Sequence, residues 1–343
     1  METGARAGLA VETVACPLCQ TERCTPVFTQ GDRLLGGAGQ YTTARCDGCG
    51  LLYQNPRVRA DEIALAYPDT YAAHVREPSL SRYLRRHDAT VRWLLSRRRG
   101  YAHLTTDDVG FGDRLRALWV RRRIRDAFPA WTGSGRLLDV GCASGKFLRQ
   151  MLAVGWKIAG IEIDEAAANK ARSVTPNIVV GDPAQLSLPA ESFDVITAFH
   201  VVEHMPDPLG ALRNMLRWLA PGGVIVVEVP NAAGAVARVF GRYWSAYDVP
   251  RHLVHFTPAT MTSLVERAGG RVATVTHRTK PRYASRSLKA WLSDRNHVGA
   301  RLSRAVVSSR LGGGVLKILL EIVMPAARAL RRGDAVRFVI VAR

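Results

Sequence analysis

The stretch Leu137-Leu-Asp-Val-Gly-Cys-Ala-Ser-Gly145 carries the strongest structural signal in this chain. A short apolar run leads into a glycine-rich turn, and a helical pattern follows the turn. Glycines at positions 141 and 145 let the backbone approach a ligand closely, because glycine has no Cβ. Ala143 departs from the three-glycine fingerprint of dinucleotide-binding turns. A strand that runs through such a turn into a helix indicates a nucleotide-binding unit of an α/β fold.

Short apolar runs alternate with helical patterns downstream of this turn. We expect strands over 137–140, 157–161, 177–180, 193–199 and 223–229, and helices over 145–154, 164–173 and 207–219. Such alternation predicts a parallel sheet that is covered by helices on both faces. A helix over 258–268 and strands over 271–277 and 335–341 complete the module. The long segment between these two strands predicts a helical insertion.

Four cysteines near the N-terminus form two C-x2-C pairs: Cys16, Cys19, Cys46 and Cys49. In a chain with no secretory signal, this spacing favours a metal site over disulfides. Four thiolates around one zinc ion make a closed structural site with no open position for chemistry. We therefore predict a zinc ribbon with strands over 41–45 and 51–53, although Gln20 stands where a glycine usually closes the first turn.

The chain divides into five expected segments. They are a zinc ribbon over 1–56, a helical linker or lid over 57–132, a Rossmann-like module over 133–280, a helical insertion over 281–334 and the final strand over 335–343. Helices of the linker are expected over 61–67, 79–99 and 114–128. The insertion would be a lid, a dimer surface, or, with Lys317 and Glu321 on an apolar helix over 315–324, an interfacial membrane helix.

The net charge of +19 is concentrated in two flanks of a neutral module. Residues 133–270 carry 12 basic and 12 acidic residues, whereas residues 76–125 carry 14 against 5 and residues 271–343 carry 16 against 3. Basic flanks suit nucleic acid, an anionic membrane or a phosphorylated substrate, and they also occur as plain solvated surface. No basic run is interleaved with aromatics as in an RNA-stacking platform, so nucleic acid is not the expected partner. The absence of a signal peptide and of a long apolar run predicts a cytoplasmic protein.

Further landmarks follow the glycine turn in a fixed order: Glu162, Gly181-Asp182, Phe193-Asp194, Glu203-His204 and Leu219-Ala-Pro-Gly-Gly223. Over residues 133–277 their order and spacing resemble the class I S-adenosylmethionine-dependent methyltransferases. The resemblance implies a seven-stranded sheet whose last strand is antiparallel, and methyl transfer from S-adenosylmethionine. It also implies a set of cofactor-binding residues: Asp139, Gly141 and Gly145 for the methionine part, Glu162 for the ribose, Asp182 for the adenine and His200 beside the sulfonium. Cys142 and Ile163 are expected to be cofactor-binding as well.

The ribbon and the loop after the fifth strand indicate one subgroup of these methyltransferases. Together they are similar to zinc-ribbon methyltransferases of sugar and natural-product biosynthesis, including nucleotide-sugar C-methyltransferases. Those enzymes place a Glu-His pair in this loop, where the present chain has Arg251-His252, so the histidine matches and the glutamate does not. The resemblance implies a small-molecule acceptor that is phosphorylated or nucleotide-linked.

Methyl transfer requires a positioned nucleophile, exclusion of water and, for a protonated nucleophile, a base. We expect His252 to be the base or the main polar contact to the acceptor, with Asp248 orienting its imidazole and His204 nearby. His255 is expected to be turning into the next helix. An alternative role for this loop is that Arg251 clamps a substrate carboxylate or phosphate. The alternatives to a catalytic role are structural. Glu203 and His204 would form a hydrogen-bonded pair at a helix start, and His252 would only bind backbone carbonyl groups of the loop.

Two other functions fit the same sequence features. An RNA methyltransferase would use the zinc ribbon and the basic flanks, and its RNA binding would depend steeply on salt. A noncatalytic S-adenosylmethionine-binding or zinc-ribbon adaptor would keep the fold without the chemistry. Peripheral contact with an anionic membrane remains a third possibility for the basic C-terminal segment.

Overall fold

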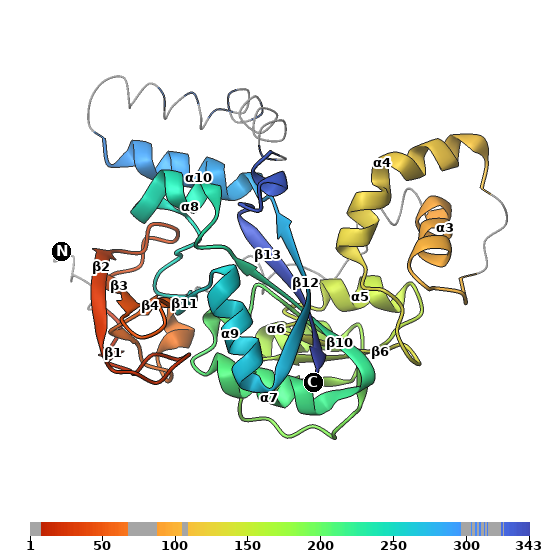
Figure 1. Cartoon of the computed structure of the whole chain (residues 1–343), viewed down its shortest axis with the longest axis horizontal. Helices are drawn as coiled ribbons and strands as arrows, with labels where there is room; N and C mark the ends of the chain where they lie inside the picture. The colour runs from red at the N-terminus through yellow and green to blue at the C-terminus, as the bar shows by residue number, and fades with distance from the viewer. Residues whose placement is uncertain are drawn as a thin grey trace.

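The computed structural model describes residues 8–67, 88–104, 109–295 and 326–343, and isolated positions 303, 306, 309, 312, 314 and 324. The expected helix over 79–99 is described only as α3 (Asp88–Arg98). The apolar helix expected over 315–324 lies outside the described residues except for its last position. A ribbon sheet lies at one end of the described molecule, a helix pair lies at the other, and a large sheet lies between them (Figure 1).

The large sheet has seven strands in the order β12-β13-β10-β9-β6-β7-β8. Their bounds are β6 (Arg136–Val140), β7 (Lys157–Glu162), β8 (Ile178–Val180), β9 (Phe193–Phe199), β10 (Leu219–Pro230), β12 (Gly270–Arg278) and β13 (Ala335–Ala342). The five neighbouring strands β10, β9, β6, β7 and β8 pair in parallel. Strand β13 pairs antiparallel with both β10 and β12. The expected seven-stranded Rossmann-like sheet with an antiparallel last strand is confirmed.

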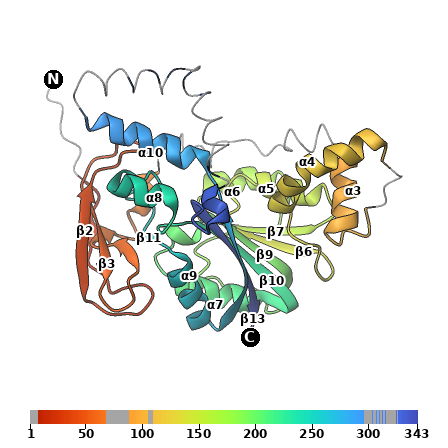
Figure 2. The same cartoon turned by 45° about the horizontal axis from the view of Figure 1, so that its top comes forward.

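Helices cover both faces of this sheet (Figures 1 and 2). The helices are α4 (Phe111–Ala127), α5 (Lys146–Leu152), α6 (Glu165–Arg172), α7 (Pro208–Trp218) and α9 (Pro258–Ala268). Successive strand residues point to opposite faces, so Leu137 packs in the core with α4, α5 and α6. Its neighbour Leu138 packs in the other core with α7 and α9. Both leucines are buried, which is why the strands read as continuous apolar runs.

The ribbon sheet has the strand order β11-β4-β3-β2. Its strands are β2 (Cys24–Gln30), β3 (Tyr41–Cys46), β4 (Leu52–Gln54) and β11 (Val254–His255), and β1 (Val11–Glu12) pairs separately with β5 (Arg57–Val58). Strand β11 comes from the loop after β10, and its His255 pairs with Leu52. The expectation that His255 turns into the next helix is therefore wrong, because α9 begins only at Pro258 after a Thr257 capping box.

A small helical layer lies beside the ribbon (Figure 2). It consists of α8 (Ala235–Phe240), the 3-10 turn η3 (Gly241–Tyr243) and α10 (Pro281–Ser293), which is the start of the expected insertion. Two further 3-10 turns are η1 (Ile63–Ala66), where a helix over 61–67 was expected, and η2 (Val202–His204). Among the described residues, no helix combines the length and the apolar character that crossing a bilayer requires.

Candidate active site

The carboxyl ends of β6, β7 and β9 meet at one edge of the large sheet. The strand order runs outward from β6 through β7 on one side and through β9 on the other. In open α/β sheets such a reversal marks the crevice beyond the strand ends where a ligand is expected to bind. The glycine turn, Glu162 and His200 all follow strands that end at this edge.

The turn after β6 adopts the tight conformation that its glycines indicate. Gly141 and Gly145 have φ of 72° and 80°, and Ala143 is held at 47°. A Cβ on Gly141 would lie 2.4 Å from the Val201 side chain, so glycine is required there. Cys142 is buried in the core on the β6 side, which leaves only its backbone facing the turn. A contact between Cys142 and the cofactor, as expected from the sequence, would therefore be made by its backbone.

Glu162 ties the glycine turn to the end of β7. Its Oε2 accepts a hydrogen bond from the Ala143 N–H at 2.7 Å, and its Oε1 accepts from the Ile163 and Asp164 N–H groups. A carboxylate offers about four lone-pair sites, so Oε2 keeps one site for a ribose hydroxyl. Ile163 beside it is 65% exposed and available to a ligand.

Two aspartates complete this part of the crevice. Asp139 is buried and accepts a hydrogen bond of 2.6 Å from the Thr197 hydroxyl. Burial and then the charge of Glu162 raise the pKa of Asp139 to about 7. Asp182 is half-buried after β8 and accepts from the Ala184 N–H at 2.9 Å. The groups nearest the turn are therefore carboxyl groups, which suit ribose hydroxyls and a cationic sulfonium better than a pyrophosphate. The residues present fit S-adenosylmethionine.

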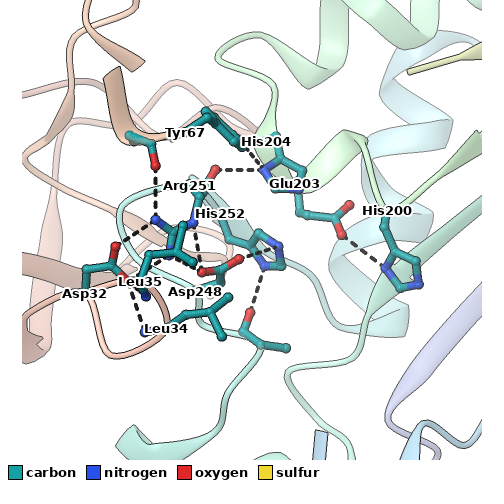
Figure 3. Close-up of polar contacts among 12 residues, drawn as sticks. Asp32, Leu34, Leu35, Tyr67, His200, Glu203, His204, Asp248, Arg251 and His252 are labelled. Atoms are coloured by element: carbon teal, nitrogen blue, oxygen red, sulfur yellow. Dashed lines mark hydrogen bonds and ion pairs between the residues drawn. The ribbon is translucent and has the colours of Figure 1, made fainter. Parts of the chain in front are cut away.

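His200 lies between two carboxylates at the end of β9, one of which, Glu203, is shown beside it in Figure 3. Its Nδ1 is 3.3 Å from Glu203 Oε1, and its Nε2 is 3.3 Å from Glu228 Oε1. Burial opposes the charged imidazolium, but the two carboxylates outweigh burial and raise the pKa of His200. Glu228 also pairs with Lys280 at 2.6 Å and with the guanidinium groups of Arg278 and Arg337. These contacts lower its pKa despite burial, so His200 lies beside a fixed negative charge.

Glu203, His204 and His252 form a second cluster next to His200 (Figure 3). One ligand-type atom of each residue lies within 4.8 Å of the corresponding atoms of the other two. The rings of His204 and His252 meet edge to face at 4.5 Å between centroids. Burial, followed by the charge of His252, lowers the pKa of His204 to about 4. The structure thus brings His204 and His252 together, as the sequence led us to expect.

The backbone orients the imidazole of His252. Its Nδ1 lies 2.8 Å from the Ala246 carbonyl oxygen, whereas Asp248 Oδ2 is 3.7 Å from its Nε2. Since a carbonyl oxygen only accepts, Nδ1 carries the proton and Nε2 carries a lone pair. Asp248 is therefore a neighbour of His252 at the free nitrogen and does not hold the ring by a direct hydrogen bond.

Arg251 forms ion pairs within the protein. Its side chain is fully buried and binds the carboxylates of Asp32 and Asp248 and the Ala66 carbonyl oxygen. The expectation that Arg251 clamps a substrate carboxylate or phosphate is therefore wrong. The carboxylates that it binds belong to the chain itself, and they connect the ribbon to the loop that carries His252.

The four ribbon cysteines come together in space. Cys16 and Cys49 have their sulfurs 3.6 Å apart, and Cys19 and Cys46 have theirs 3.4 Å apart. Sulfurs placed tetrahedrally about 2.3 Å from one zinc ion lie about 3.8 Å apart, which is close to these distances. Both turns use the same backbone conformation, with φ of 63° at Gln20 and 74° at Gly50. Gln20 thus occupies the left-handed conformation that glycine usually provides.

A cavity of about 410 Å³ opens between the ribbon, the 243–249 loop and α10. Its lining includes three basic side chains, Arg33, Arg286 and Lys289, together with Tyr243 and Trp244. Asp248 also lines this cavity, so the cavity adjoins the cluster of Glu203, His204 and His252. No sequence pattern indicated it, because its walls come from three distant segments.

Two residues near the site were not predicted from the sequence. The Tyr67 hydroxyl lies 2.8 Å from His204 Nδ1, and Glu228 is paired with His200. Tyr67 had no distinguishing pattern around it. Glu228 did, because it is the one charged residue within the apolar run 224–229. A buried charge of this kind needs a partner and could have drawn attention to β10.

Comparison with known proteins agrees with this geometry. Residues 113–275 match the family model described as a methyltransferase domain. A ubiquinone biosynthesis O-methyltransferase of Thiobacillus denitrificans is 29% identical over 169 residues, which cover 45% of this chain and 70% of that protein. A malonyl-[acyl-carrier protein] O-methyltransferase of Serratia marcescens is 31% identical over 127 residues, which cover 36% and 49%.

The chain spans about half the length of most of the curated relatives that it matches. A solved structure of a SAM dependent methyltransferase from Archaeoglobus fulgidus is 22% identical, covers 68% of this chain and 98% of its own, and has a TM-score of 0.43. Residues 113–275 are thus similar to a methyltransferase domain, and they contain five of the seven strands of the large sheet and most of a sixth, β12.

Proposed function

We propose that this chain transfers a methyl group from S-adenosylmethionine to a small-molecule acceptor. The observation that carries the proposal is the position of the His200–Glu203 pair. It follows β9 at the edge of the sheet where the glycine turn and Glu162 also end. Polar groups for an acceptor therefore lie beside the crevice proposed for the cofactor. In that crevice Glu162 would hold the ribose and Asp182 the adenine, with the turn from Gly141 to Gly145 around the methionine part.

The bound cofactor supplies a methyl group on a good leaving group, so the protein has to position the acceptor and remove its proton. His252 suits this role, because its Nδ1–H is donated to Ala246 and its Nε2 is free to take a proton. His204 supports the ring of His252 from the side, and Glu203 fixes His200. Burial of the cluster keeps water away from the transferred methyl group.

We propose an acceptor that carries a phosphate or nucleotide, as in sugar and secondary-metabolite intermediates. The basic lining of the 410 Å³ cavity supports this choice, since Arg286 and Lys289 face it and have no ion pair among the described residues. The aromatic ring of Tyr243 adds a surface on which a base or sugar ring could stack. The names of the two relatives above refer to ubiquinone biosynthesis and to malonyl-[acyl-carrier protein], and neither name refers to a sugar.

We also propose that Cys16, Cys19, Cys46 and Cys49 bind one structural zinc ion. The near-tetrahedral sulfur spacing supports this proposal, and no side chain of the active site takes part in the cluster. The zinc would fix the ribbon, whose Asp32 holds Arg251 beside His252.

The test is methyl transfer from isotopically labelled S-adenosylmethionine to a panel of sugar phosphates, nucleotide sugars, unphosphorylated sugars and RNA. We expect labelled product with the phosphorylated or nucleotide-linked acceptors. Charge reversal in Arg286→Glu and Lys289→Glu should raise KM for the acceptor at least about 10-fold, whereas Arg271→Glu on β12 should not. Product from unphosphorylated acceptors or RNA alone would overturn the acceptor assignment.

A further inference from the structure

Glu203, His204 and His252 bring metal-type ligand atoms together in a group that contains none of the ribbon cysteines. One atom of each residue lies within 4.8 Å of the other two. Glu203 and His204 belong to the turn η2 after β9, and His252 precedes β11, so the fold joins two separate segments here (Figure 3). Glu203 and His252 are buried, and His204 is half-buried.

Backbone carbonyls fix which nitrogen of each imidazole is free. His252 Nδ1 lies 2.8 Å from the Ala246 carbonyl oxygen, so Nδ1 carries the proton and Nε2 carries a lone pair. His204 Nδ1 lies 3.0 Å from the Arg251 carbonyl oxygen and 2.8 Å from the Tyr67 hydroxyl. The carbonyl oxygen can only accept, so the tautomer that satisfies it has the proton on Nδ1 and leaves a lone pair on His204 Nε2. Metal-binding histidines usually show this arrangement, in which the second nitrogen donates to a carbonyl or carboxylate and so orients the ring.

Glu203 contributes a carboxylate oxygen that lacks a partner. Its Oε1 contacts His200 Nδ1 at 3.3 Å, but its Oε2 is buried and accepts no hydrogen bond from any residue that the structure describes. The Glu203 side chain is only 2% exposed, so water does not readily reach this oxygen. A buried polar atom in this state is unfavourable unless a partner binds it.

We propose that Glu203, His204 and His252 bind a divalent transition-metal ion, separate from the zinc proposed for the cysteines. Two imidazoles and one carboxylate are a ligand set for zinc, iron(II) or cobalt(II), and three protein ligands leave a coordination position open. Such ions bind nitrogen and oxygen at about 2.0–2.2 Å, so the three side chains would have to move closer together on binding. The ion would supply the missing partner of Glu203 Oε2.

This site gives the acceptor a second means of activation. An acceptor oxygen at the open position would become more acidic, because a divalent cation stabilises its deprotonated form. His252 would then hold the ion instead of taking the proton itself. Substitution of His252 lowers turnover in both cases, so metal binding is the measurement that separates them. It uses no methyl transfer, and its failure would leave the proposed function standing.

The test is a titration of cobalt(II), followed by visible absorption, into full-length protein whose cysteine site is filled with zinc. We expect one cobalt per chain, with the absorption of nitrogen and oxygen ligands and no sulfur-to-cobalt charge transfer. Glu203→Gln, His204→Gln and His252→Asn, each checked for folding by circular dichroism, should weaken binding at least about 10-fold. His103→Asn, at an exposed histidine outside the cluster, should bind as the wild type does. No spectrum beyond free cobalt, or an unchanged affinity in every folded cluster variant, would overturn the proposal.

Discussion

Arg251 and Asp32, which are 219 residues apart in the chain, form a bidentate ion pair with contacts of 2.7 and 2.8 Å. Both side chains are buried, at 0% and 3% exposure. The guanidinium, with Asp248 as its second carboxylate partner, holds the pKa of Asp32 below its usual range although burial opposes this. The pair fastens the ribbon to the loop that carries His252, so the ribbon is part of the structure that shapes the site.

Removing one charge of this pair should therefore destabilise the protein strongly. Asp32→Asn leaves Arg251 buried with only Asp248 as an anionic partner, and breaking a buried pair costs about 3–5 kcal/mol. Urea unfolding at neutral pH measures the loss. Arg33→Gln is the matched control, because Arg33 pairs with Asp294 at the surface, where such a pair contributes at most about 1 kcal/mol. A loss in Asp32→Asn no larger than in Arg33→Gln would contradict this account of the ribbon contact.

His255 should make stability depend on pH. Burial, and then the charge of His252, lowers the pKa of His255 to about 3 from an ordinary value of 6.5. Between these values the unfolded chain binds more protons than the folded one. The contribution of neutral His255 is therefore complete above pH 6.5 and is lost as the pH falls, by up to about 1.4 kcal/mol per unit.

Urea unfolding of the wild type and of His255→Gln between pH 7.5 and 5 tests this expectation. The variant should lose part of the slope below pH 6.5, whereas His103→Gln, at an exposed position, should keep it. Identical slopes in the wild type and His255→Gln would show that His255 is not held neutral by burial.

The cysteine cluster should retain zinc through dialysis against a mild chelator. Because folding and metal binding are coupled in such ribbons, Cys46→Ser should lose the ion and expose the ribbon to limited proteolysis. Cys24→Ser should keep about one zinc per chain, since the Cys24 sulfur lies outside the cluster and accepts a hydrogen bond from Asn55. Elemental analysis of the wild type, Cys46→Ser and Cys24→Ser measures the zinc content per chain. Equal and negligible zinc in the wild type and Cys46→Ser would contradict the ribbon assignment.

His252→Ala should lower turnover at least about 100-fold, because loss of an acceptor-activating group typically has this effect. Affinity for S-adenosylhomocysteine should change little, since in the proposed function His252 contacts the acceptor and not the cofactor. Steady-state kinetics with the best acceptor of the panel measures the effect, with His103→Asn as the control. An active His252→Ala together with an inactive His255→Ala would show that this role belongs to His255 and that its assignment to His252 is wrong.

The central sheet was predictable because its signals are local. The apolar run at 193–199 predicted β9 with its observed bounds, and the glycine turn after 140 marked the end of β6. Each of these elements is specified by about ten neighbouring residues. The cysteine pairs were equally local, and the structure brings their four sulfurs together as the spacing indicated.

The remaining features depend on contacts between distant segments. Strand β11 has only two residues, and it exists because Val254 and His255 pair with Tyr53 and Leu52 of the ribbon. The partner of Arg251 lies in the ribbon, so nothing in the neighbouring sequence showed that its guanidinium was already occupied. Asp248 and His252 were correctly expected to be neighbours, but the carbonyl of Ala246 that orients the imidazole belongs to the backbone, which carries no sequence signal.

The central claim is that the methyl donor binds at the carboxyl edge of the sheet, with Glu162 on its ribose. A calorimetric titration of S-adenosylhomocysteine into the wild type, Glu162→Gln and Glu165→Gln tests it most directly. Glu165 is the control, because it lies in the adjacent helix α6 and is exposed. A charge-assisted hydrogen bond contributes about 1.5–3 kcal/mol. We therefore predict one site per chain, about 10- to 100-fold weaker binding in Glu162→Gln and unchanged binding in Glu165→Gln. No binding to the wild type, or equal affinity in all three proteins, would contradict the claim.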